Sequence, residues 1–488
     1  MQSGFTACPG LFYATPARDG ILSRIRIPGG IINSTQCCVL ADIAEYCGGG
    51  YVDVTNRANL QIREIYTTID EKILGRLQNI GLGSSNTDVD HIRNIMSSPT
   101  AGIDRQELID TRPLVQAWDK YIAVHPHLSG LPAKFSVCFD GGGTVRVCDR
   151  PNDIGFAAVL IDGNLYFRLH LSLNASKPPM DTGILLNPEE CLPVLVALAE
   201  VYLNHLDTTS SRKPRLRELL NTLGCKNYLQ EVQRRLPFPL QSVGSQEYQN
   251  QIPTNQYKHI SIHPQRQSGL SYIGVILPLG RLETVQIRRL ADLAERYGSG
   301  TIRLTPWQNL LISDIPNQRL PDIQREIESL GLHWSVTNIR SALVACSGNT
   351  GCASSATDTK GHGRELAAYL DHLKLSQPVN IHFTGCSKSC AQHTKSDIAL
   401  LGVSINQGKA TVEGYHVYVG DSDQKFGREV YQYVTLAELP TLIEQMLRVY
   451  KIQRLTPDES FGEFANRHTM AQLKQLFSPN KAKVKSKE

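Results

Sequence analysis

The sequence has no long apolar run, little net charge and no dense pattern of cysteines, and each absence excludes a class of protein. No apolar stretch in the 488 residues approaches the about 20 residues that a transmembrane helix needs, so we expect no membrane partner. The net charge is only +4 and the basic residues are scattered, which argues against a nucleic-acid partner. Residues 1–20 lack a basic segment followed by an apolar stretch, so we expect a cytoplasmic protein without a secretory signal.

Four of the twelve cysteines stand out by their spacing. Cys346 and Cys352 are separated by five residues, and Cys386 and Cys390, further along, by three. In a reducing compartment, clustered cysteines indicate metal binding or catalysis, and four thiolates on tight turns are typical of an iron–sulfur cluster. We expect nearby glycines to turn backbone N–H groups toward the sulfurs: Gly348, Gly351 and Gly385. The alternatives are four unrelated buried cysteines or a zinc site, although zinc motifs more often have shorter spacings.

One segment of the sequence occurs twice, at a constant offset of 250 residues. Ile25–Ile65 aligns without a gap to Val275–Ile315. The identical pairs include Pro28 and Pro278, Gly30 and Gly280, Gln36 and Gln286, Thr55 and Thr305, and Asn59 and Asn309. Such a repeat predicts two copies of one α/β unit in a pseudo-twofold arrangement, with a site at their junction.

Within the first copy, alternation and turn residues predict a strand–helix–strand–strand–helix order. The expected strands are Leu22–Ile27, Tyr51–Thr55 and Asn59–Ile65, with a helix capped by Ser34 or Thr35 and another over Asp70–Ile80. Between the copies we expect strands at Lys134–Cys138, Val145–Cys148, Phe156–Ile161 and Leu165–Leu171, and helices at Asn187–Leu206 and Arg215–Leu223. Pro237–Pro253 is expected to be a linker, and a further helix is expected at about Gly363–Leu373.

Basic residues recur on strands and turns of the first part of the chain. Arginine forks bind carboxylates through two hydrogen bonds, and a ligand with many acidic groups would need several of them. The candidates for a polycarboxylate or anion site are Arg24, Arg26, Arg57, Arg63, Arg93 and Lys134, each of which could also be an ordinary surface charge.

With these residues in place, the chain resembles the nitrite and sulfite reductase family, whose members use siroheme and a [4Fe-4S] cluster. The resemblance spans nearly the whole length, and the segments that carry it are Arg24–Gly30, Val54–Arg63, Ala101–Pro113, Leu131–Phe135, His263–Gly269 and both cysteine pairs. It implies that Cys346, Cys352, Cys386 and Cys390 hold the cluster and that Cys390 lies nearest the tetrapyrrole. It also implies that Arg24, Arg26, Arg57, Arg93 and Lys134 line the tetrapyrrole and anion site.

The fold implied is α+β: duplicated ferredoxin-like half-domains with pseudo-twofold symmetry plus two α/β domains of the nitrite/sulfite reductase type. The expected half-domains are 1–95 and 246–335, and the reductase-type domains are 96–245 and 336–478, the latter binding the cluster. Residues 479–488 are expected to form a disordered basic tail.

Within the family, three features resemble the precorrin-3B synthases of aerobic cobalamin biosynthesis. These are the opening Ala7–Tyr13, with no long extension before it, the pair Ser387-Lys388 where reductases usually have Pro-Asn, and Ala133 with Ser136 where reductases have basic or amide residues. The first expectation is therefore a monooxygenase that converts precorrin-3A and O2 to precorrin-3B by hydroxylation and lactone formation. It would use the [4Fe-4S] cluster, a mononuclear iron that activates O2, and an external donor, either a ferredoxin or an NAD(P)H-linked reductase.

The alternative is a ferredoxin-dependent assimilatory nitrite or sulfite reductase with siroheme. Ala101–Pro113 and His263–Ile312 are very similar to ferredoxin-dependent nitrite reductases, although the replaced basic residue at Ser136 argues against sulfite. A non-catalytic iron–sulfur scaffold is a third class. No catalytic residue is assigned, and His263 and His393 are candidate proton donors only because they lie near motifs.

Overall fold

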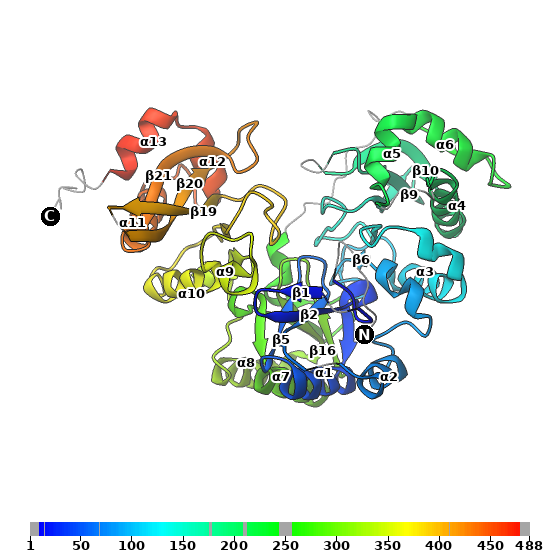
Figure 1. The fold of residues 1–488 in the computed structure, drawn as a ribbon, viewed down its shortest axis with the longest axis horizontal. Helices are drawn as coiled ribbons and strands as arrows, with labels where there is room; N and C mark the ends of the chain where they lie inside the picture. The colour runs from blue at the N-terminus through cyan, green and yellow to red at the C-terminus, as the bar shows by residue number, and fades with distance from the viewer. Residues whose placement is uncertain are drawn as a thin grey trace. The chain divides into compact units, whose positions relative to one another are not determined.

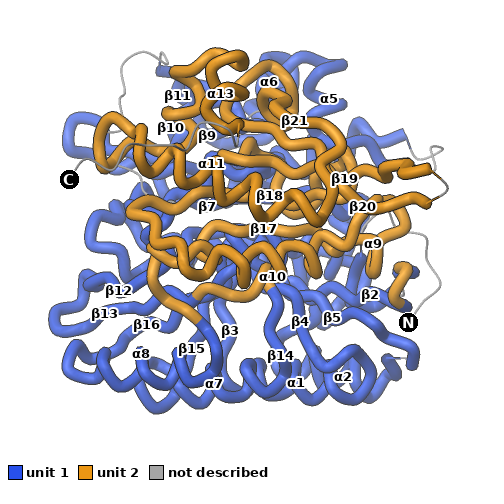
Figure 2. The backbone as a smooth tube through the Cα atoms, turned by 90° about the vertical axis from the view of Figure 1, so that its left-hand side faces the viewer, with its two compact units in different colours: residues 1–16, 20–275, 281–332 blue, residues 17–19, 276–280, 333–488 orange. Residues whose placement is uncertain are grey.

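The computed structural model describes residues 9–13, 15–67, 69–174, 178–207, 212–243, 256–408 and 410–478 (Figure 1). The predicted tail and residues 244–253 of the predicted linker lie outside these ranges. The chain divides into two compact units (Figure 2). Unit 1 comprises residues 1–16, 20–275 and 281–332, and unit 2 comprises residues 17–19, 276–280 and 333–488.

The two sequence copies form two similar sheets, and each sheet takes one short strand from the other copy. The first sheet has the order β1-β2-β5-β4-β14 and the second β12-β13-β16-β15-β3. Its strands are β1 (Thr15–Ala17), β2 (Gly20–Ile25), β5 (Leu60–Ile65), β4 (Tyr51–Val54) and β14 (Arg281–Glu283). Those of the second are β12 (Ser261–Pro264), β13 (Leu270–Val275), β16 (Leu310–Pro316), β15 (Thr301–Leu304) and β3 (Ile31–Asn33). This reciprocal exchange is the pseudo-twofold relation that the repeat predicts.

Helices α1 (Ser34–Cys47) and α7 (Thr284–Tyr297) are equivalent in the two copies and are joined by ion pairs from Arg288 to Asp42 and Glu45. The prediction that Ser34 or Thr35 caps α1 is wrong. Asn33 is the cap, because its side chain accepts from Gln36 N while the Gln36 side chain accepts from Asn33 N. The second helices of the copies are α2 (Glu71–Asn79) and α8 (Leu320–Ser329).

The third sheet of unit 1 has the order β11-β10-β9-β8-β7-β6. Its strands are β6 (Ile95–Ser97), β7 (Val137–Asp140), β8 (Ile154–Ile161), β9 (Asn164–Leu171), β10 (Met180–Leu186) and β11 (Gln241–Ser242). The accompanying helices are α3 (Arg112–Val124), α4 (Cys191–Asn204), α5 (Leu216–Leu223) and α6 (Cys225–Gln233). Sheet and helices share one apolar core around Trp118, Phe135 and Tyr202.

The predicted strand at Val145–Cys148 is wrong, since this segment is a loop. Its backbone N–H groups at Val147 and Cys148 donate to the Asp140 carboxylate at 2.8 and 3.0 Å. A side chain therefore satisfies donors that a sheet would otherwise pair, and alternating apolar residues could not reveal it.

Unit 2 is built on a sheet of order β17-β18-β19-β20-β21. Its strands are β17 (Leu343–Ala345), β18 (Ile381–Thr384), β19 (Ile398–Gln407), β20 (Ala410–Val419) and β21 (Arg428–Thr435). The helices are α9 (Gly348–Gly351), α10 (Thr359–Tyr369), α11 (Leu439–Gln453), α12 (Phe461–Asn466) and α13 (Met470–Phe477). The helix predicted at about 363–373 thus begins four residues earlier, where Asp358 caps it by accepting from Gly361 N. Among the described residues, no helix is long and apolar enough to cross a membrane.

Candidate functional site

The two cysteine pairs follow neighbouring strands of the unit 2 sheet, at the carboxyl ends of those strands. Strands β17 and β18 are parallel neighbours, with Ala345 opposite Phe383. Cys346 directly follows β17, and Cys386 follows β18 after Gly385. Because parallel strands point the same way, their carboxyl ends deliver both pairs to one place. The backbone N–H of Cys346 completes the pairing by donating to Phe383 O at 3.2 Å.

Gly385 joins the two cysteine loops. Its N–H donates to the Cys346 sulfur at 3.3 Å, which confirms the predicted N–H to sulfur contact at this glycine. Its carbonyl accepts from Ala356 N, just beyond Cys352, at 2.8 Å. A Cβ at this position would lie 1.6 Å from Ser355 Oγ, so the loops can approach only around a glycine. The Thr359 hydroxyl also lies 3.4 Å from the Cys346 sulfur.

The thiol of Cys390 lies close enough to the other three thiols to interact with their charges. Cys390 is the most exposed of the four, yet partial burial raises the pKa of its thiol. Repulsion from the other three thiolates raises this pKa further, in the order Cys386, Cys346, Cys352. At the same time, no three His, Cys, Asp or Glu side chains in the described ranges form a site for a single metal ion.

The predicted basic residues lie in unit 1, and hydrogen bonds to protein groups hold Arg93 and Arg57 in place. Arg93 is buried and donates two hydrogen bonds to the Asp119 carboxylate, at 2.7 and 3.0 Å. Burial alone would lower the pKa of Arg93, but its pairing with this carboxylate raises it. Arg57 donates to the Asn152 side chain at 2.8 Å and to Pro151 O at 2.7 Å. Both guanidinium groups are therefore fixed in position.

The other predicted basic residues differ in exposure. With the Gln61 amide assigned so that its oxygen faces Arg24, this guanidinium donates to it at 2.5 and 3.0 Å. Arg26 is fully buried, donates to Pro9 O at 3.2 Å and lies 3.7 Å from the Asp90 carboxylate. Arg63 is buried on β5, whereas Lys134 is exposed. Arg24 lies on β2, and Arg26 directly follows its last residue, Ile25.

A buried chain of two amides connects the segments that carry four of these residues. Asn59 Oδ1 accepts from Ile27 N at 2.8 Å, and Asn59 Nδ2 donates to Asn94 Oδ1 at 3.4 Å. Asn94 Nδ2 in turn donates to Ala133 O at 2.9 Å. The chain thus links the neighbours of Arg26, Arg57, Arg93 and Lys134. We did not predict these asparagines as site residues, although the match of Asn59 to Asn309 in the repeat singled one of them out.

A further arginine was missed by the prediction. Arg146 lies in the loop after β7, and its Nε and one terminal nitrogen are buried with no hydrogen-bond partner in the described part of the chain. Arg26 Nε is in the same condition. Unsatisfied buried donors cost free energy, and a carboxylate-rich ligand would satisfy them. The donor chemistry of unit 1 therefore fits a tetrapyrrole with acidic side chains.

The two candidate proton donors have different surroundings. His263, on β12, bonds through Nε2 to Ile260 O at 2.7 Å, and burial lowers its pKa. It packs against Tyr272, which indicates a structural role. His393 is exposed and follows the second cysteine pair.

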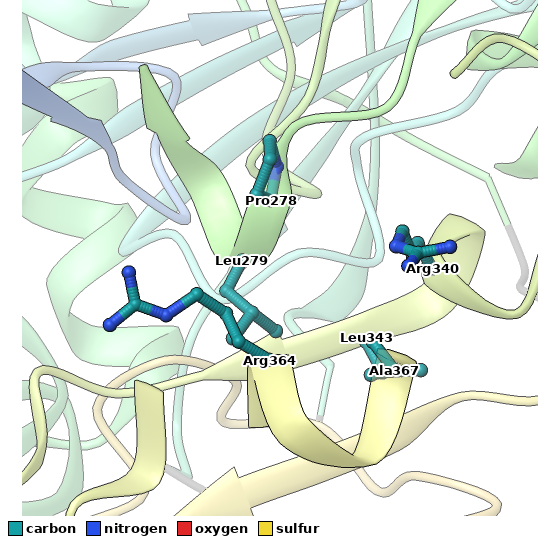
Figure 3. A pocket seen from close by; sticks show the side chains of 6 residues that line it. All are labelled: Pro278, Leu279, Arg340, Leu343, Arg364 and Ala367. Atoms are coloured by element: carbon teal, nitrogen blue, oxygen red, sulfur yellow. The ribbon is translucent and has the colours of Figure 1, made fainter. Parts of the chain in front are cut away.

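One cavity of about 160 Å³ lies within unit 2, and Figure 3 shows its lining. Leu279, Leu343 and Ala367 provide apolar walls, while Arg340 and Arg364 contribute charge. Arg340 is already paired with Asp371. The cavity contains neither a cysteine of the two pairs nor any predicted basic residue, so it is separate from the candidate site.

Comparison with known proteins identifies the family. A model described as the nitrite and sulphite reductase 4Fe-4S domain matches residues 88–240 and 336–485. A second, described as the nitrite/sulfite reductase ferredoxin-like half domain, matches residues 15–78 and 263–330. The chain therefore belongs to the nitrite and sulfite reductase family and is an oxidoreductase. The predicted fold class and the [4Fe-4S] cofactor are confirmed, together with the siroheme expected for the reductase alternative.

Two curated relatives are named as ferredoxin–nitrite reductases. A ferredoxin–nitrite reductase of Synechococcus elongatus is 31% identical over 90% of this chain and 88% of its own length. One of Leptolyngbya laminosa is 34% identical over 84% and 82%. The solved structure of the Mycobacterium tuberculosis NirA protein matches with a TM-score of 0.78 and 25% identity, covering 93% of this chain and 84% of that one.

The expectation of a precorrin-3B synthase is wrong, since these relatives, matched over most of the chain, are named ferredoxin–nitrite reductases. The predictions of a monooxygenase reaction and of precorrin-3A and O2 as substrates are therefore also wrong. The error came from weighting a few local departures, such as Ser387-Lys388, above the reductase-like segments Ala101–Pro113 and His263–Ile312.

Proposed function

We propose that the protein is a ferredoxin-dependent nitrite reductase that carries siroheme and a [4Fe-4S] cluster. The observation that carries the proposal is that the two cysteine pairs follow the carboxyl ends of β17 and β18 and that their four thiols interact. Relatives matched over most of this chain are named ferredoxin–nitrite reductases. Ferredoxin as electron donor is supported by the same names.

The residues of unit 2 would hold the cluster. Cys346, Cys352, Cys386 and Cys390 supply the four thiolates, while Gly385 N and the Thr359 hydroxyl contact the Cys346 sulfur. Such contacts stabilise negative charge on sulfur and tune the reduction potential. When bound, the cluster and siroheme supply the electron-transfer and ligand-binding chemistry of the reaction.

The residues of unit 1 would hold the siroheme carboxylates and the anionic substrate. Arg26 and Arg146 have buried donors to offer, and Lys134 has an exposed ammonium group. Arg24, Arg57, Arg63 and Arg93 complete the proposed set. The chain of amides through Asn59 and Asn94 keeps several of these segments in register, so that the cations are positioned before the ligand arrives.

The substrate is proposed to be nitrite rather than sulfite. Ser136 is buried, and its hydroxyl and N–H both donate to the Asp153 carboxylate. It therefore contributes no cation where a sulfite reductase would be expected to have one. A site with one cation fewer suits a monoanion better than a dianion, because fewer charges need to be neutralised.

The test is a turnover assay with the anaerobically purified protein and chemically reduced ferredoxin. Consumption of nitrite with matching formation of ammonium, at a kcat/KM well above that for sulfite, is the expected result. A protein that contains both cofactors but turns over sulfite faster than nitrite would contradict the choice of substrate.

A further inference from the structure

Lys388 lies within the second cysteine loop, at one of the positions where this sequence departs from the usual reductase pattern. Its side chain is exposed, and Nζ donates to Ser354 Oγ at 3.0 Å. Ser354 comes two residues after Cys352, so this contact ties the loop of one cysteine pair to that of the other. The ammonium group is thereby held between the two cysteine loops.

A second lysine is fixed on the same loop. Lys425 Nζ donates to Ser387 O at 2.6 Å and to Lys388 O at 3.3 Å. These carbonyls belong to the residues between Cys386 and Cys390, so the loop carries one cation in its own sequence and a second on its backbone.

The charge of a cluster becomes one unit more negative when it accepts an electron. A fixed positive charge nearby stabilises the reduced form more than the oxidised form, and the attraction grows as the surroundings become less polar. Net charge near the cluster is one of the means by which proteins set reduction potentials. The pairing of β17 with β18 and the contacts of Gly385 also join the two cysteine loops, and they involve neither lysine.

We propose that the positive charges of Lys388 and Lys425 raise the reduction potential of the cluster and so favour electron uptake from the donor. The proposal rests on the four cysteines of the proposed function being the cluster ligands. It assigns a role to the Ser387-Lys388 departure, which the proposed reaction itself does not explain.

The test is a redox titration of the complete, anaerobically purified protein, followed by electron paramagnetic resonance of the reduced cluster. Lys388→Gln and Lys425→Gln should each move the midpoint potential to more negative values at unchanged iron and sulfide content. Lys388→Arg keeps the charge and should leave the potential close to that of the wild type. The difference between wild type and Lys388→Gln should shrink at high salt, because mobile ions screen exposed charges.

Lys451→Gln is the matched control. Lys451 is an exposed lysine of the same unit whose Nζ also donates to a backbone carbonyl, Lys374 O at 3.0 Å, but it lies on α11, which carries no cysteine. An unchanged potential in Lys388→Gln, or an equal shift in Lys451→Gln, would overturn the proposal.

Cluster content separates this proposal from the proposed function. Loss of iron and sulfide in Lys388→Gln but not in Lys388→Arg would assign the charge to cluster assembly, which also overturns it. Absence of iron and sulfide from the wild-type protein would instead overturn the proposed function itself.

Discussion

Asn59 and Asn94 lie 35 residues apart in sequence and meet through a single buried hydrogen bond, from Asn59 Nδ2 to Asn94 Oδ1 at 3.4 Å. Asn59 also binds the backbone next to Arg26, and Asn94 binds the backbone next to Lys134. The two amides thus connect four segments whose basic residues we assign to anion binding. Side chains with no charge of their own hold the charged ones in place.

Replacing Asn94 with leucine should therefore destabilise unit 1 and weaken tetrapyrrole binding. The substitution leaves the Asn59 amide and Ala133 O without their partners, at a cost of about 1–3 kcal/mol for each buried group. We expect a lower free energy of unfolding in urea and a larger loss of siroheme than of iron–sulfide in the purified protein.

Asn227→Leu is the control for this prediction, because Asn227 is exposed on α6 and its Nδ2 donates to Leu223 O at the end of α5. An equal loss of stability and siroheme in both variants would show that the pair of amides has no special role.

Substitutions at Lys134 and Arg93 should have different effects, the first mainly on nitrite binding and the second mainly on the free energy of unfolding. Lys134 is exposed, so Lys134→Gln should leave the free energy of unfolding within about 0.5 kcal/mol of the wild type while raising KM for nitrite. Arg93→Gln breaks the buried pairs with Asp119 and Asp90, and should cost about 3–5 kcal/mol. Urea unfolding and steady-state kinetics on both variants check this. A Lys134→Gln enzyme with wild-type kinetics would remove this lysine from the proposed anion site.

His382 should make the protein sensitive to acid. It is fully buried on β18, and burial lowers its pKa from 6.5 to about 3, with smaller contributions from His393 and Lys425. Between these two values the unfolded chain binds a proton at this residue and the folded chain does not. The free energy of unfolding should therefore fall as pH drops from about 6.5 toward 3, by up to about 1.4 kcal/mol per pH unit.

His382→Gln does not titrate and should lose this part of the pH dependence while remaining folded at neutral pH. The check is the slope of unfolding free energy against pH in the two proteins. Parallel slopes would mean that the buried imidazole is protonated in the folded state as readily as in the unfolded one.

Much of the fold could be predicted because periodicity and repetition are local properties of a sequence. The offset of 250 residues predicted two equivalent units, and the structure has them, with β14 and β3 exchanged. The exchange itself was not predictable, because it depends on which edge of each sheet remains open. The loop at Val145–Cys148 was mistaken for a strand because the Asp140 carboxylate satisfies its N–H groups from elsewhere in the chain.

The candidate site also has a part that the sequence could predict and a part that it could not. The cysteine spacing was informative because a cluster requires a particular residue type at each ligand position, and β17 and β18 provide the common edge. The anion site was harder to predict, because the sequence does not reveal which arginines are buried or what they pair with. Arg93, for example, is buried and forms two hydrogen bonds with Asp119. The orphaned donors of Arg146 appear only once burial is known.

The most direct test of the cluster assignment is iron and acid-labile sulfide analysis of the anaerobically purified wild type, Cys390→Ser and Cys225→Ser. Cys225 lies at the start of α6 in unit 1, outside both cysteine loops, and serves as the control. We predict about four irons and four sulfides per chain for the cluster in the wild type and in Cys225→Ser, in addition to the siroheme iron. Cys390→Ser should lose them while keeping a folded circular dichroism spectrum. Zinc without sulfide in the wild type, or an intact cluster in Cys390→Ser, would contradict the account.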